Sequence, residues 1–168
     1  VLDLMEGEGA LDYRRFWVHS LTVAFTAALL PRYSEALTDS DVSEQLFTCG
    51  ILHDVGMMIF DRDVPEAYGP VLDQAAKGEE PVHEIEERML GIDHAELATH
   101  VLQAWHIPAD ITDAVAAHHH PLGARSTQLL TAEALALSNL LSYARDIGHH
   151  PGICPDPFSE AVWHDLQI

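Results

Sequence analysis

The chain has 168 residues, of which 48% are apolar, enough to bury one sizeable core but not two independent ones. Its 8 basic and 27 acidic residues give a net charge of −19, which repels nucleic-acid phosphates and anionic membrane surfaces. No apolar run approaches the roughly 20 residues that cross a bilayer, and residues 1–13 lack the pattern of a signal peptide. We therefore expect a one-domain cytoplasmic protein without a nucleic-acid or membrane partner.

Residues 12–30 form the first predicted helix, because apolar residues recur along them at helical spacing. His19 falls on the same stripe, so its imidazole should face inward. The other members of this stripe are Phe16, Val23, Ala27 and Leu30.

A second helix should begin after the polar residues 38–40, whose side-chain oxygens can cap its free amides. Its buried stripe closes at His53, and Asp54 lies beside that histidine, about 100° round the helix. We expect Gly50 to let another backbone approach closely and Gly56 to end or bend the helix. The stripe that leads to His53 consists of Val42, Leu46 and Cys49.

Proline and glycine residues mark out the next two helices. Pro65 should begin one helix, which ends before Gly78, and Pro81 should begin a shorter one, which ends at Gly91. Both segments are acidic, so we expect them to be partly solvated.

Two further helices should each place a histidine inward. The helix opened by Pro108 leads to His118 at its C-terminus, with His119 adjacent. In the helix that starts near Asp93, His94 shares one face with Ala98, Val101 and Trp105.

The last third of the chain contains one buried helix and a tail. Residues 129–141 are apolar almost all round, which predicts a central helix, and Asn139 is one of its few polar interruptions. The tail at 149–168 should be irregular except for a short last helix that packs Val162 and Trp163 on the body. Because strand alternation is absent, we expect an all-α bundle of about six to eight helices over residues 1–148.

Some conspicuous side chains favour structural roles. Trp17 and Trp105 could stack a nucleobase, but their spacing among apolar neighbours makes them core anchors. A solvated helix face is our interpretation of the acidic cluster Glu84, Glu86 and Glu87.

The inward histidines are informative as a group. Any one of them is more often a hydrogen-bonded core residue than a ligand. Together they come from different helices, each at the inward end of a stripe, as metal sites in helical bundles require. The group consists of His19, His53, Asp54, His94 and His118.

Four strings, FWVHSL, GILHDVGM, GIDHAELATHVLQAWHIP and AVAAHHHP, follow one another along the chain. This order resembles the HD superfamily of metal-dependent phosphohydrolases and, much more closely, its HDOD branch, the HD-related output domain of bacterial signalling proteins. The resemblance covers residues 16–144 and implies an HD-domain-like helical bundle. It also implies that a family member carries an N-terminal helical half, so we expect the chain to be a fragment of that domain.

The resemblance implies a set of metal ligands and one departure from it. The closing aspartate of the superfamily should fall in the last buried helix, where we place Asn139. An amide is a weaker ligand than a carboxylate, so metal affinity should drop. In the cyclic-dinucleotide phosphodiesterase branch a lysine follows the HD pair by three residues, and this chain has Met57 there. The implied ligands are His19, His53, Asp54, His94 and His118, with His119 as a further candidate.

These features favour a regulatory output domain without catalytic turnover, which acts through contacts with a protein partner or a neighbouring signalling domain. One alternative is a metal-dependent phosphohydrolase that acts on a nucleotide, a cyclic dinucleotide or another phosphate ester, in which Asp54 reaches two ions and is the essential carboxylate. Another is a metal or nucleotide sensor that binds at the same site without hydrolysis. The cofactor expected is a divalent transition metal, namely iron, manganese, zinc or nickel, with an empty site as the open alternative. The oligomeric state is left open.

Overall fold

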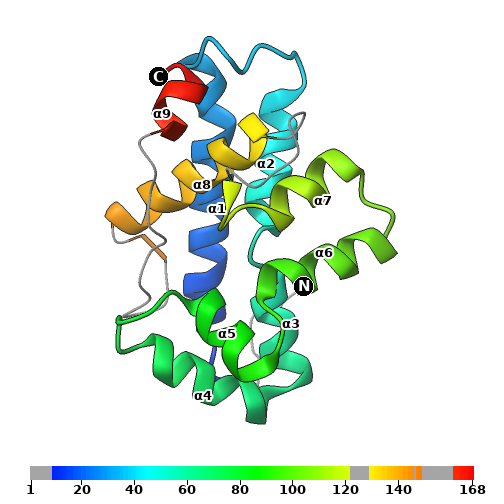
Figure 1. The fold of residues 1–168 in the computed structure, drawn as a ribbon, viewed down its shortest axis with the longest axis vertical. Helices are drawn as coiled ribbons and strands as arrows, with labels where there is room; N and C mark the ends of the chain where they lie inside the picture. Colours follow the sequence, from blue (N-terminus) through cyan, green and yellow to red (C-terminus); the bar gives the residue numbers. More distant parts are fainter. Residues whose placement is uncertain (1–8, 122–128, 146, 149–160) are drawn as a thin grey trace.

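The computed structural model describes residues 9–121, 129–145, 147–148 and 161–168, and every element of regular secondary structure within them is a helix (Figure 1). The all-α prediction is therefore confirmed. None of the described helices is both long and apolar enough to cross a membrane.

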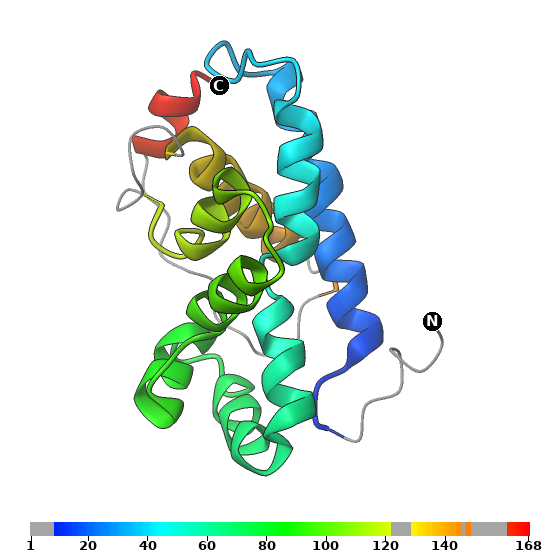
Figure 2. The same cartoon turned by 90° about the vertical axis from the view of Figure 1, so that its right-hand side faces the viewer.

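The first two long helices form a closely packed pair. Figure 2 shows α1 (Tyr13–Leu29) beside α2 (Val42–Leu52), and the short 3-10 helix η2 (Leu30–Arg32) continues from the end of α1. A Cβ added at Gly50 of α2 would lie 2.4 Å from Cα of Ala24 in α1. The predicted role of Gly50 in a close backbone approach is confirmed.

The chain breaks its helical run between α2 and α3 (Val55–Asp63). His53 caps α2, and Asp54 leaves the helical conformation with φ −101° and ψ 8°. We expected Gly56 to end or bend the helix, but the break falls before it, at His53 and Asp54, and this glycine lies in the first turn of α3. A Cβ there would lie 2.0 Å from the carbonyl oxygen of His94, so Gly56 lets α3 contact the start of α6.

The helices that follow begin and end near the prolines, glycines and Asp93 that were predicted to bound them. Gly91 adopts φ +80° after α5, and the Asp93 carboxylate accepts a hydrogen bond of 2.7 Å from the Glu96 amide at the start of α6. These elements are α4 (Pro65–Ala75), α5 (Val82–Leu90), α6 (His94–Ala104) and α7 (Ala109–Ala116).

The predicted central helix is α8 (Leu129–Ala144), which packs against α1, α2 and α7. The last helix, α9 (Ala161–Leu166), packs against α8, and the Ser34 hydroxyl donates to the Leu166 carbonyl. Residues 149–160, where an irregular tail is predicted, lie outside the described ranges.

Apolar clusters occupy both ends of the bundle. One cluster joins the start of α1 to α3, α4 and α5, with Phe60, Tyr68 and Leu72 among its members. The other joins the end of α1 to α2, α8 and α9, with Leu46 and Leu137 among its members. His19 lies on α1 between the residues that this helix gives to the two clusters, because Phe16 belongs to the first cluster and Ala27 to the second.

Two tryptophans predicted to pack on the body are exposed. The Trp105 side chain is 61% exposed, because α6 ends at Ala104 and its buried stripe runs through Ala98 and Leu102 instead. In α9 the buried face includes Val162, as predicted, whereas Trp163 is 39% exposed.

Candidate metal centre

The predicted ligand residues converge at the junction between α2 and α3. Asp54 stands at this junction and is only 5% exposed. His53 precedes it at the end of α2, and His19 reaches it from α1. His94, the first residue of α6, and His118, just after α7, approach from the opposite side.

Four imidazole nitrogens surround the carboxylate of Asp54. Its Oδ2 atom lies 3.0 Å from Nε2 of His53 and 3.4 Å from Nε2 of His19. Its Oδ1 atom lies 3.3 Å from Nε2 of His94 and 3.6 Å from Nε2 of His118. The four rings are at most 3% exposed.

Hydrogen bonds on the far side of the rings assign the tautomers of His53 and His118. Nδ1 of His53 lies 2.8 Å from the Gly50 carbonyl, and Nδ1 of His118 lies 2.7 Å from the Val115 carbonyl. A carbonyl oxygen can only accept a hydrogen bond, so Nδ1 of both rings carries the proton.

The same assignment holds for the other two rings. The Ser142 hydroxyl donates to the Ile147 carbonyl at 3.0 Å, so it accepts from Nδ1 of His19 at 3.1 Å. Nδ1 of His94 lies 2.5 Å from Oε2 of Glu86, a carboxylate that accepts the proton of that ring. The other nitrogen, Nε2, points at Asp54 in all four rings. When a ring is neutral, its Nε2 atom carries a lone pair and no proton.

In this arrangement the lone pairs of the Nε2 atoms face the lone pairs of the Asp54 carboxylate. Nε2 of His19, His53 and His118 has no hydrogen-bond partner, and the carboxylate of Asp54 has no proton to offer. A cation between them resolves the conflict. Ligand atoms about 2.1 Å from an ion lie about 3.0–3.4 Å apart in octahedral or tetrahedral geometry, close to the distances around Asp54. Imidazole and carboxylate donors suit iron, manganese, zinc and nickel.

The pKa values of the site follow from burial and from the neighbouring charges. Burial would raise the pKa of Asp54, but the imidazoles of His53, His118 and His19 outweigh it and hold this pKa well below its ordinary value. Burial lowers the pKa of His53, although the neighbouring Asp54 acts to raise it. For His94 the effect of burial is outweighed by Glu86 and Asp54, which raise its pKa well above the ordinary value.

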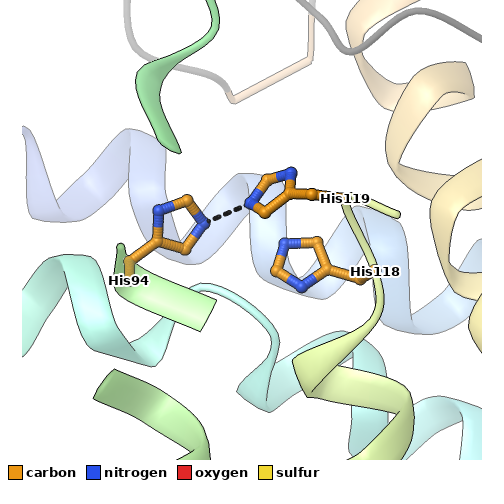
Figure 3. A group of neighbouring side chains, drawn as sticks. All are labelled: His94, His118 and His119. Carbon is orange, nitrogen blue, oxygen red and sulfur yellow. Dashed lines mark hydrogen bonds between the residues drawn. The ribbon is translucent and has the colours of Figure 1, made fainter. Parts of the chain in front are cut away.

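The ligand atoms fall into two groups. In one, atoms of His19, His53 and Asp54 lie within 4.8 Å of one another. The second group is His94, His118 and His119, which Figure 3 shows with the three rings turned toward one another. Nε2 of His119 lies 2.8 Å from Nε2 of His94. Each group could hold one ion.

Asn139 is buried in α8, with 5% of its surface exposed. Its Oδ1 atom has no hydrogen-bond partner, although a buried amide oxygen normally has one. The position therefore keeps an unpaired oxygen in the interior, with one negative charge fewer than an aspartate would bring.

Glu86 is the site residue that the sequence interpretation missed. It is fully buried, whereas Glu84 and Glu87 are exposed as predicted. Oε1 of Glu86 accepts a hydrogen bond of 2.7 Å from the Tyr68 hydroxyl, and Oε2 accepts one of 2.8 Å from the backbone amide of His94. The signal was present in the spacing, because Glu86 falls on the stripe of Val82 and Ile85.

The fold and the buried histidine–aspartate cluster define a helical domain of the HD type. Residues 1–121 match the family model "HDOD domain", and the chain belongs to this family. The matched residues include all the clustered histidines and Asp54, and they end before α8.

Solved structures share the fold. An HDOD domain protein of unknown function from Geobacter sulfurreducens superimposes with a TM-score of 0.83 at 22% identity, covering 99% of this chain and 56% of that one. The MmoQ response regulator from Methylococcus capsulatus gives a TM-score of 0.66 at 23% identity, covering 94% of this chain and 57% of that one. Both structures are less than 25% identical to this chain, so what they show is the shared fold.

A curated relative is an uncharacterized protein of Treponema pallidum (strain Nichols), 25% identical over 109 residues. The match covers 65% of this chain and 21% of that protein. The chain thus spans about a fifth of the length of this relative and about half of the solved chains above.

Proposed function

We propose that this domain is a regulatory module that acts through contacts with a protein partner or a neighbouring signalling domain and holds a divalent transition metal without turning over a substrate. The main support for a bound metal is that Nε2 of His19, His53 and His118 points at Asp54 and has no hydrogen-bond partner. His19, His53, Asp54, His94 and His118 would hold the ion, and His119 would complete a second position. When bound, the ion would join α1, α2, α6 and α7 at one point.

The charges around the centre support the absence of turnover. A phosphohydrolase must neutralise the charge that develops on a phosphoryl group, and lysine or arginine side chains assist the metals in doing so. Every lysine and arginine in the described ranges is exposed. Met57, in the position of the phosphodiesterase lysine, is buried in the apolar cluster of α3, α4 and α5.

The burial of the ligands supports the same conclusion. Catalytic metal sites keep a position open for water or substrate, whereas structural sites are closed by protein ligands. Here Asp54 and the four rings around it are at most 5% exposed. His119 is only half-buried, so it lies on the more open side of the centre.

One observation favours the alternative, a metal-dependent phosphohydrolase. Oδ2 of Asp54 faces His53 of the first group, and Oδ1 faces His94 of the second, so this carboxylate could bridge two ions. Two bridged ions can generate a hydroxide nucleophile and stabilise phosphoryl oxygens. Asn139 argues against a fully charged two-ion site, because its amide brings no negative charge.

Turnover assays separate the two functions. The full chain is incubated with iron(II), manganese, zinc or nickel and then with chromogenic phosphate monoesters and diesters and with a cyclic dinucleotide. We expect the same product formation from wild type and from His53→Ala, at the level of buffer with metal. Hydrolysis by the wild type that His53→Ala abolishes would instead establish the phosphohydrolase.

A further inference from the structure

The outer face of α1 carries an apolar stripe that no described helix covers. Val18 and Leu21 are each 42% exposed, Leu29 is 45% exposed and Phe25 is 60% exposed. Tyr33, just after η2, is 71% exposed and continues the line. The four residues in α1 are separated by three, four and four positions, which is the spacing of one helix face, and Tyr33 outside the helix adds a fifth apolar residue. We call them the α1 stripe.

The α1 stripe is additional to the buried face of the same helix. Phe16, Val23 and Ala27 already pack inward, so α1 is apolar on two sides. Figure 2 shows α1 along one edge of the bundle, with α2 on its inner side. A helix that is apolar on two sides is typical of one buried on both.

The stripe has the dimensions and composition of an interface. Phe25 packs edge to face on Phe47 of α2, with ring centroids 5.3 Å apart, which widens the apolar surface. The exposed parts of the stripe add up to several hundred Å², a size at which surface patches mark interaction sites. Its aromatic residues, Phe25 and Tyr33, are of the kind that anchor interfaces.

Basic residues flank the stripe although the chain has a net charge of −19. Arg14 and Arg15 stand at its start and Arg32 at its end, and all three are exposed. They are three of only 8 basic residues in the chain. Arg15 pairs with Asp12 at 3.6 Å, whereas Arg14 and Arg32 have no ion pair with another described residue.

These charges argue against a second copy as the occupant. In an antiparallel pairing of two α1 helices, Arg14 and Arg15 of one copy would face Arg32 of the other. In a parallel pairing, Arg14 and Arg15 would face their own counterparts. Both arrangements bring like charges together at the ends of the stripe, whereas acidic residues at those positions would face opposite charges.

We propose that the α1 stripe docks an amphipathic helix of a partner protein, with an apolar face about as long as α1 and acidic residues at both ends. The 17 residues of α1 correspond to about 25 Å of helix. This inference rests on the proposed regulatory function and names the contact through which it acts. His19 projects from the opposite face of α1 into the cluster around Asp54, so the docking helix would contact the element that bears a site ligand.

Fluorescence anisotropy with a labelled designed peptide tests the proposal. The test peptide is a helix of about 17 residues with leucines along one face and glutamates at both ends. A control peptide has the same leucines, with lysines in place of the glutamates. Phe25→Glu is the stripe variant. Met89→Glu, at a 43% exposed position on α5, is the matched control. Circular dichroism checks that both variants stay folded.

We expect saturable binding of the acidic peptide, weakened about tenfold or more by lysine ends or by Phe25→Glu and unchanged by Met89→Glu. No binding, or equal binding of the two peptides, would overturn the proposal. So would self-association in analytical ultracentrifugation that Phe25→Glu abolishes, because a second copy would then be the occupant. Metal content, measured on the same samples, tests the metal centre separately, since Phe25 lies outside it.

Discussion

Nδ1 of His94 lies 2.5 Å from Oε2 of Glu86, and the two side chains are both buried. The contact fixes the ring so that Nε2 points at Asp54, 3.3 Å away. A carboxylate behind a histidine makes that histidine a more basic ligand and holds its orientation.

The first prediction concerns this pair. Glu86→Gln keeps the size of the side chain but removes the negative charge behind His94, so metal affinity should fall about 10- to 100-fold. The exposed neighbour Glu87 supplies the control, since Glu87→Gln should leave the affinity unchanged. Competition with a metal-binding dye measures both variants. Equal affinities for Glu86→Gln and wild type would mean that Glu86 has no part in the centre.

A second prediction tests how α3 positions His94. A Cβ at residue 56 would lie 2.0 Å from the His94 carbonyl oxygen, so Gly56→Ala must move the start of α6. We expect a loss of about 1–3 kcal/mol in the free energy of unfolding, together with weaker metal binding.

The control for this variant lies in α4. A Cβ at Gly69 would meet nothing within 4 Å, so Gly69→Ala should change stability by no more than about 1 kcal/mol and leave metal binding intact. Urea unfolding and metal titration of both variants make the comparison. Metal binding that is unaffected by Gly56→Ala would show that the contact between α3 and α6 does not position the ligand.

Helical periodicity was sufficient to predict most of the helices and the inward direction of the buried histidines. His19, His53 and His94 each end or share an apolar stripe, so their direction follows from spacing within one helix. The break at Asp54 was not predictable in this way, because it depends on the packing of α3 against α6 through Gly56.

Glu86 and Trp105 show where residue type misled the interpretation. A glutamate beside other glutamates suggests a solvent-exposed helix face. The hydrogen bonds from the Tyr68 hydroxyl and from the His94 amide explain why Glu86 is buried instead. A tryptophan at helical spacing suggests a core anchor, but α6 ends one residue before Trp105. Both outcomes depend on tertiary contacts that no single helix encodes.

The third prediction is a pH dependence of stability at the contact between α8 and α9. Burial, with a contribution from Asp165 of α9, raises the pKa of Glu133 from 4.5 to about 7. The folded protein therefore binds more protons than the unfolded chain between these values, and stability falls as pH rises through this range. Replacement of the carboxyl by an amide removes that penalty.

Glu133→Gln should thus stabilise the protein more at pH 8 than at pH 5. Urea unfolding at the two pH values measures the difference, and the exposed Glu84→Gln serves as the control that should show none. A stability change that is the same at both pH values would contradict the assignment of this proton to Glu133.

A fourth prediction addresses Asn139. Asn139→Asp places a carboxylate where the amide oxygen now lacks a partner, so the variant should bind metal more tightly. Without metal, the new buried charge should destabilise the fold. Thermal unfolding with and without metal should therefore show a larger metal-induced rise in Tm than for wild type. An identical rise in both proteins would place residue 139 outside the metal centre.

The central claim is that the cluster around Asp54 holds a metal ion, and elemental analysis of the purified chain tests it most directly. The protein is prepared without chelators, exchanged into metal-free buffer and compared with Asp54→Asn, with circular dichroism as the check on folding. We predict about one or two equivalents of iron, manganese, zinc or nickel in the wild type and a large loss in the variant. A folded wild-type protein with no bound transition metal, even after incubation with each of these ions, would contradict the account.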